Sequence, residues 1–110
     1  MRLVRFALVF TLLLSIWVSW ANAQIQKNYY SYKDGGEWHD ALTWTEDPTG
    51  QTRQPAAGAG VPEDNAIVTI GSNVHLTSDV LRQNLHITIA QNGTLDMRDK
   101  KFREPIFELN

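Results

Sequence analysis

The chain has 110 residues, with ten basic and twelve acidic side chains and no cysteine. A net charge of −2 without a basic stripe argues against nucleic acid and anionic membrane surfaces as partners. The lack of cysteine excludes disulfide bonds and the acylated cysteine of a bacterial lipoprotein. In an exported protein, this composition fits a bacterial product better than an animal one.

Residues 1–23 have the layout of a secretory signal peptide. Arg2 and Arg5 precede an apolar run from Phe6 to about Val18, and Ala21-Asn22-Ala23 gives a small-x-small cleavage pattern. The alternative is an uncleaved anchor, but the run is shorter than the roughly 20 residues that span a bilayer. We expect cleavage before Gln24, a secreted or cell-surface location, and no membrane span in the mature chain.

The mature chain, residues 24–110, is long enough for one small domain and has a net charge of −4, since Arg2 and Arg5 are removed. It begins with QIQKNYYSYK, where Tyr29, Tyr30 and Tyr32 are typical of a strand entering a sheet. Residues 46–65 are rich in proline and glycine and have no apolar periodicity. They predict an exposed loop excursion.

From Ala66 onward the sequence reads as two similar units of strand, turn and strand. Val68-Thr69-Ile70 matches Ile87-Thr88-Ile89 at an offset of 19, and Val74-His75-Leu76 matches Leu95-Asp96-Met97 at an offset of 21. Alternating apolar and polar residues indicate strands with one buried face. The predicted core residues are Val68, Ile70, Val74, Leu76, Leu85, Ile87, Ile89 and Leu95.

These units predict an all-β fold, and a period near 20 residues favours the start of a parallel β-helix, or β-solenoid. A small β-sandwich or meander, with an antiparallel hairpin at Asn92-Gly93, is the alternative. Asn92-Gly93-Thr94 is formally a glycosylation sequon, but we interpret it as a turn in which Asn-Gly accepts positive φ. The last apolar run, Ile106, Phe107 and Leu109, lacks a polar cap, so we expect the N-terminal fragment of a longer solenoid.

The segment DGGEWHDALTW, residues 34–44, is the richest in chemical groups. Glu37 or Asp40 could act with His39 as acid or base, but no matching partner is found elsewhere in the sequence. Trp38 and Trp44 could stack on sugar rings. We favour a structural cap in which Trp38, Asp40 and Trp44 cover the first end of the β-core, and we expect no catalytic residue.

Metal and cofactor sites have little support in the sequence. No two of His39, His75 and His86 have the spacing of zinc ligands, and the last two fall on the polar alternate positions of their strands. The acidic pieces TEDPTG and PEDN do not match a dedicated calcium loop. We therefore expect no cofactor and no metal, and leave calcium binding by the acidic loops open.

Three stretches together resemble a known family. They are DGGEWHDALTW, PAAGAGVPEDNAIVTIGSNVHLTSDV and NLHITIAQNGTLDM, which span roughly residues 30–97. They resemble the N-terminal module of long secreted β-helix proteins of Gram-negative, polysaccharide-degrading bacteria, and are similar to the eight-glycine extracellular domain. The shared positions are Gly36, Trp38, Asp40, Thr43 and Trp44, then the strand residues and Gly93. The resemblance implies the start of a right-handed parallel β-helix and carries over no catalytic residue.

Our functional expectation is an exported, non-enzymatic module that caps and initiates a β-helix in a secreted or cell-surface protein. Its partners would be downstream domains of the same chain. The alternatives are a carbohydrate-binding module that uses surface tryptophans, with polysaccharide as the partner, or the non-catalytic part of a polysaccharide-degrading enzyme.

Overall fold

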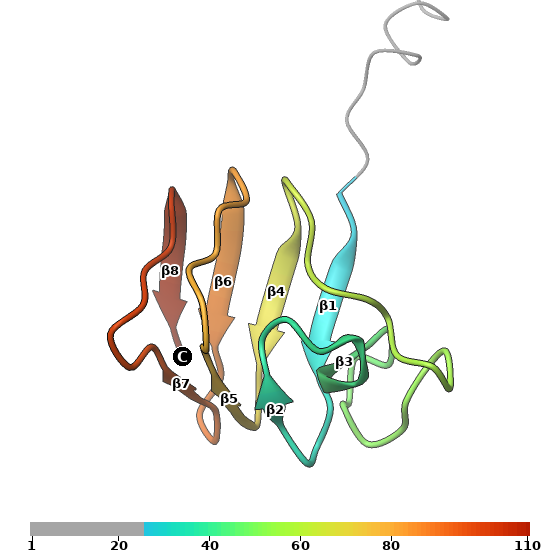
Figure 1. Cartoon of the computed structure of the whole chain (residues 1–110). Helices are drawn as coiled ribbons and strands as arrows, with labels where there is room; N and C mark the ends of the chain where they lie inside the picture. The colour runs from blue at the N-terminus through green and yellow to red at the C-terminus, as the bar shows by residue number, and fades with distance from the viewer. Residues whose placement is uncertain (1–25) are drawn as a thin grey trace, which may run out of the picture.

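A computed structural model describes residues 26–110, so the expected signal peptide lies outside the described residues. The described chain consists of short strands, one 3-10 helix and connecting turns (Figure 1). The prediction of an all-β fold is confirmed. In order, the elements are β1 (Asn28–Ser31), β2 (Gly36–Glu37), η1 (Ala41–Thr43), β3 (Trp44–Thr45), β4 (Ile67–Ile70), β5 (Asn73–His75), β6 (Leu85–Ile89), β7 (Thr94–Asp96) and β8 (Pro105–Leu109).

The strands form two open sheets. The larger has the order β3-β1-β4-β6-β8, and the smaller has the order β2-β5-β7 (Figure 1). All neighbouring strands are parallel except β1 and β3, which are antiparallel, so the larger sheet is mixed. From β4 onward, each strand of one sheet is followed in the chain by a strand of the other.

The register of the parallel strands reproduces the offsets in the sequence. Val68 pairs with Ile87, an offset of 19, and Val74 pairs with Leu95, an offset of 21. Ile87 then pairs with Phe107, an offset of 20. The antiparallel hairpin at Asn92-Gly93 is wrong, because β6 and β7 belong to different sheets and pair with other strands.

The core lies along the inner faces of the two sheets. Six of the eight predicted core residues are buried, and Ile89 and Leu95 are partly buried against the same cluster. Burial alternates along β4 because successive residues of a strand face opposite sides of the sheet. Val68 and Ile70 are buried, whereas Ile67 and Thr69 are half-buried. The buried members of the cluster are Tyr29, Trp38, Trp44, Ala59, Ala66, Val68, Ile70, Val74, Leu76, Val80, Leu85, Ile87 and Phe102.

The turn at Asn92-Gly93 forms, but for a different reason from the one expected. The amide of Gly93 donates to the carbonyl of Ala90 at 2.9 Å, yet neither Asn92 nor Gly93 has a positive φ. Instead, a Cβ on Gly93 would lie 1.9 Å from the carbonyl oxygen of Ile70. Glycine is required here because two successive turns approach each other closely.

We predict that Gly93→Ala destabilises the fold by about 1–3 kcal/mol, because the methyl group overlaps a backbone carbonyl that cannot move freely. Gly71→Ala is the matched control, since a Cβ there meets nothing within 4 Å. Urea unfolding followed by tryptophan fluorescence measures both changes. Equal stability of the two variants would contradict this explanation.

Candidate functional site

The segment 34–44 begins with a tight turn between β1 and β2. Gly35 and Gly36 have φ of +66° and +143°, values that favour glycine, and the amide of Gly35 donates to the carbonyl of Tyr32 at 2.8 Å. A Cβ on Gly35 would lie 2.0 Å from the carbonyl oxygen of Asn73. The turn therefore packs directly on the start of β5, which fixes where the following residues enter the core.

Asp40 connects this turn to the short helix η1. It is the N-cap of η1, and its carboxylate accepts a hydrogen bond from the amide of Leu42 at 2.9 Å. The hydroxyl of Thr43 donates to the carbonyl of Glu37 at 2.8 Å across the same bend. Asp40 therefore has a local structural role, because its carboxylate accepts the hydrogen bond of a backbone amide at the start of η1.

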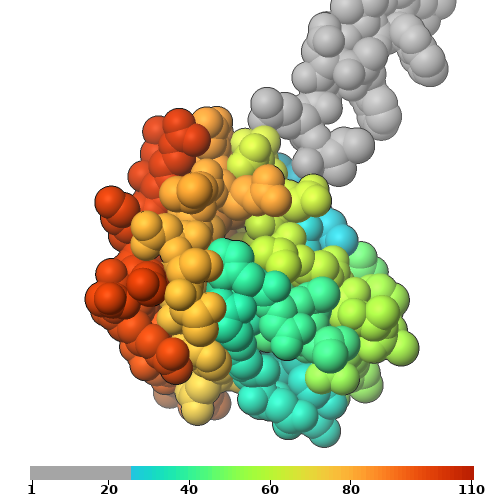
Figure 2. Space-filling view, viewed as in Figure 1, coloured from blue at the N-terminus to red at the C-terminus, as the bar shows by residue number. Residues whose placement is uncertain are grey.

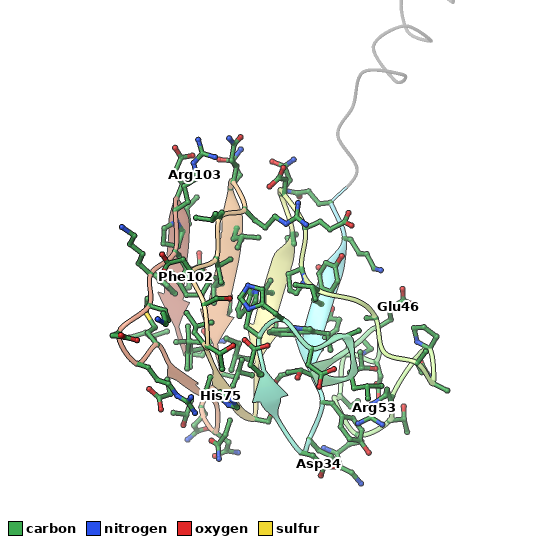
Figure 3. All side chains as sticks on the ribbon, in the orientation of Figure 1. Asp34, Glu46, Arg53, His75, Phe102 and Arg103 are labelled. Carbon is green, nitrogen blue, oxygen red and sulfur yellow. The ribbon has the colours of Figure 1, made fainter. Side chains whose placement is uncertain are left out.

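Trp38 and Trp44 are both completely buried. Their rings meet edge to face with centroids 4.9 Å apart, and the indole nitrogen of Trp44 donates to the carbonyl of Trp38 at 2.8 Å. Phe102 extends this contact, at 5.0 Å from Trp38, and lies between β7 and β8 along the chain (Figure 3). The prediction that Trp38 and Trp44 stack on sugar rings is therefore wrong, since a buried ring has no face that a sugar can reach.

Glu37 and His39 form a small polar cluster with two residues that the sequence did not indicate. The Glu37 carboxylate is 2.9 Å from His39 Nδ1 and accepts hydrogen bonds from the amide and hydroxyl of Thr77. The hydroxyl of Ser78 is 3.3 Å from the same His39 Nδ1. A relay needs the carboxylate and the hydroxyl on opposite ring nitrogens, so this geometry does not form one. Thr77 lies 40 residues from Glu37 and Ser78 lies 39 residues from His39, and only the pairing of β2 with β5 brings them close.

The pKa of Glu37 is lowered by this cluster. Partial burial acts to raise the pKa, but the hydrogen bonds from His39 and Thr77 outweigh burial and stabilise the carboxylate. The cluster therefore holds Glu37 charged at neutral pH, where it ties the start of the three-stranded sheet to the segment after β5.

In each of the two acidic loops, an aspartate carboxylate accepts hydrogen bonds from other groups of the protein. Asp47 accepts hydrogen bonds from the amides and hydroxyls of both Thr49 and Thr52, at 2.8–3.0 Å. The bond from the Thr49 amide is the largest cause that holds the pKa of Asp47 far below its ordinary value. Asp64 accepts from the amide of Gln83 at 2.8 Å and so joins two successive turns.

The other predicted polar residues lie on the surface of the strands. His75 on β5 is half-exposed (Figure 3), and His86 on β6 is exposed. Within residues 26–110, no group of three or more histidine, aspartate or glutamate side chains is arranged to hold a metal ion.

Comparison of the chain with protein-family models, curated proteins and solved structures gave no match. Residues 26–110 include no helix with the length and apolar character needed to cross a membrane.

The two tryptophans differ in their polar contacts, which gives a direct test of their roles. Trp44 Nε1 has its acceptor, whereas Trp38 Nε1 is buried without a partner among the described residues. Trp44→Phe should therefore cost about 1 kcal/mol more stability than Trp38→Phe, because only the first change removes a buried hydrogen bond. Denaturant unfolding followed by far-UV circular dichroism measures the difference. A larger loss for Trp38→Phe would contradict this ranking.

The charged carboxylate of Glu37 should stabilise the fold at neutral pH and lose this effect in acid. Because its pKa in the folded state lies below the unfolded value of 4.5, its contribution is present above pH 4.5 and is lost as pH falls further. Glu37→Gln should therefore be less stable than the native chain at pH 7, and the gap should narrow toward pH 3. Thermal unfolding across this range measures it, and a gap that stays constant would contradict the assignment.

Proposed function

We propose that this chain is an exported structural module that closes one end of a parallel β-helix and accepts further parallel strands at the other. The observation that carries the proposal is the difference between the two edges of the five-stranded sheet. Figure 2 shows the loop after β3 on one flank of the molecule and the C-terminal residues on the opposite flank. We take the helix to be right-handed, as the resemblance implies and as parallel crossovers generally favour.

Repetition of the chain path supports a helical arrangement. The inner residues of β4, β6 and β8 recur at intervals of 19 and 20 residues and pair in parallel register. In the three-stranded sheet, β5 pairs with β7 at an offset of 21 residues, and a parallel bridge joins Val80 to Phe102 at an offset of 22. Three stretches of the turn that begins at β4 thus stack on the turn that begins at β6, and β6 stacks in the same way on β8, as in a solenoid.

The first edge, at β3, is covered by the chain itself. Trp44 and Thr45 are buried, and the carbonyl of Trp44 accepts a hydrogen bond from the amide of Ala59 at 2.8 Å. The hydroxyl of Thr45 donates to the carbonyl of Thr52 at 2.7 Å and accepts from the amide of Gln54 at 2.9 Å. The loop therefore uses the Trp44 carbonyl, a group that an uncovered edge strand would offer to another strand, and the Thr45 hydroxyl anchors the loop over this edge.

The other edge, at β8, presents apolar side chains to solvent. Val68 is fully buried and Ile87 is 1% exposed, but Phe107 in the same register is 43% exposed. Leu109, which pairs with Ile89, is 79% exposed. One more parallel strand with apolar residues at these positions would bury both side chains and use the free backbone groups of β8.

The predicted signal peptide and the family resemblance extend the proposal to cellular context. We propose a secreted or cell-surface location, with downstream domains of the same chain as the partners that continue from β8. The carbohydrate-binding alternative would need residues other than the buried Trp38 and Trp44.

An added repeat tests strand addition directly. We predict that a second copy of residues 90–109, inserted after Leu109, protects the amides of β8 from hydrogen exchange and raises thermal stability. The spacing of 20 residues from Ile89 to Leu109 places the copied apolar residues over Phe107 and Leu109. Hydrogen exchange measured by mass spectrometry gives the protection of each segment.

The matched control carries aspartate in the inserted copy at the positions copied from Phe107 and Leu109. This variant should leave β8 unprotected, because aspartate at these two positions gives Phe107 and Leu109 no apolar cover and is disfavoured beside them. Fast exchange of β8 with the apolar insert would overturn the proposal, and so would equal protection by both inserts.

A further inference from the structure

A groove of about 510 Å³ lies on the outer face of the five-stranded sheet, away from the buried tryptophans. Tyr30 and Thr69 line it from neighbouring strands β1 and β4, and both alternate with buried residues, so they face outward. Residues 48–51 of the loop after β3 form one wall, beside β1 (Figure 1). The turn that contains Gln91 and Asn92 contributes the end of the groove.

The lining of this groove has a distinct chemical character. Its polar side chains are hydroxyls and amides, chiefly those of Tyr30, Thr49, Gln51, Thr69, Gln91 and Asn92. Lys33 is the single charged residue among the described residues that line it. Hydroxyl and amide groups can both donate and accept hydrogen bonds without any charge to be neutralised. Pro48, Ala90 and the Tyr30 ring add apolar surface.

The wall of the groove is ordered by its own contacts. Asp47 holds Thr49 and Thr52, and the amide of Gly50 donates to the carbonyl of Asp47 at 3.0 Å. The carbonyl of Gly50 accepts from the amide of Lys33 at 2.9 Å, which fastens the loop to the end of β1. Gly50 has a φ of +70°, and a Cβ there would lie 2.7 Å from the carbonyl oxygen of Ser31. A ligand would therefore enter a site that is already formed, with little ordering cost.

We propose that this groove binds a neutral saccharide segment. Sugar rings present many hydroxyls, which both donate and accept, and apolar C–H faces, which match a lining of hydroxyls, amides and small apolar surfaces. The volume falls within the range of about 300–1,000 Å³ that is usual for small-ligand sites. The proposal uses outward residues of β1 and β4, so it is independent of strand addition at β8.

The test uses the exported chain on an array of neutral and acidic oligosaccharides, followed by calorimetry with the neutral oligosaccharide that binds best. Thr69→Val and Gln91→Ala should each weaken binding about fivefold, the change that corresponds to one hydrogen bond of about 1 kcal/mol. Thr88→Val is the matched control, because Thr88 pairs with Thr69 on the next strand and lies outside the groove. Circular dichroism verifies that each variant folds.

Two results would overturn the saccharide site. One is that no neutral oligosaccharide binds at millimolar concentration, or that only acidic ones bind. The other is that Thr69→Val and Gln91→Ala bind as tightly as Thr88→Val. Neither result bears on the inserted-repeat experiment, which reports on β8 alone.

Discussion

Parallel stacking of apolar side chains in register is the constraint on which the rest of this structure depends. Val68, Ile87 and Phe107 lie at one register position on three successive strands, and the side chains of Val68 and Ile87 are each covered by the one on the following strand. No disulfide reinforces this stack, since the chain has no cysteine. The stability of each strand therefore comes from burial against its two neighbours, and the strands at the ends of the stack need another solution.

The two edge strands of the five-stranded sheet, β3 and β8, differ in how they are covered. At β3 the chain reverses direction, and a loop that bonds to the Trp44 carbonyl and the Thr45 hydroxyl covers the strand. At β8 the inner residues Phe107 and Leu109 remain open to solvent. The tight turns are a consequence of the same stacking, because the spacing between successive turns leaves no room for a side chain at Gly35 or Gly93.

The groups of the opening segment are explained by their local contacts. Trp38 and Trp44 supply buried volume to the core, where Trp38 also meets Phe102, and Asp40 caps the short helix η1. Glu37 joins β2 to the residues after β5. The described contacts of residues 34–44 are thus mainly packing of buried rings and hydrogen bonds to backbone groups. The surface that offers uncharged polar groups to a ligand lies instead on the outer face of β1 and β4.

The sequence by itself determined the strands β4 to β7, most of their buried residues and the offsets of 19 and 21 in their register. The alternation of Leu85, Ile87 and Ile89 with polar residues shows which face of the strand is buried, because neighbouring residues face opposite sides. The match of Val68-Thr69-Ile70 to Ile87-Thr88-Ile89 gives the offset of 19, because both segments carry the same pattern. Only the tertiary structure decided that Trp38 and Trp44 are inaccessible, that Thr77 and Ser78 meet Glu37 and His39, and that residues 48–51 form a wall beside Tyr30. These relations join residues that are distant in the chain. They depend on how β2 and β3 pair and on where the loop after β3 docks, and the sequence pattern encodes neither.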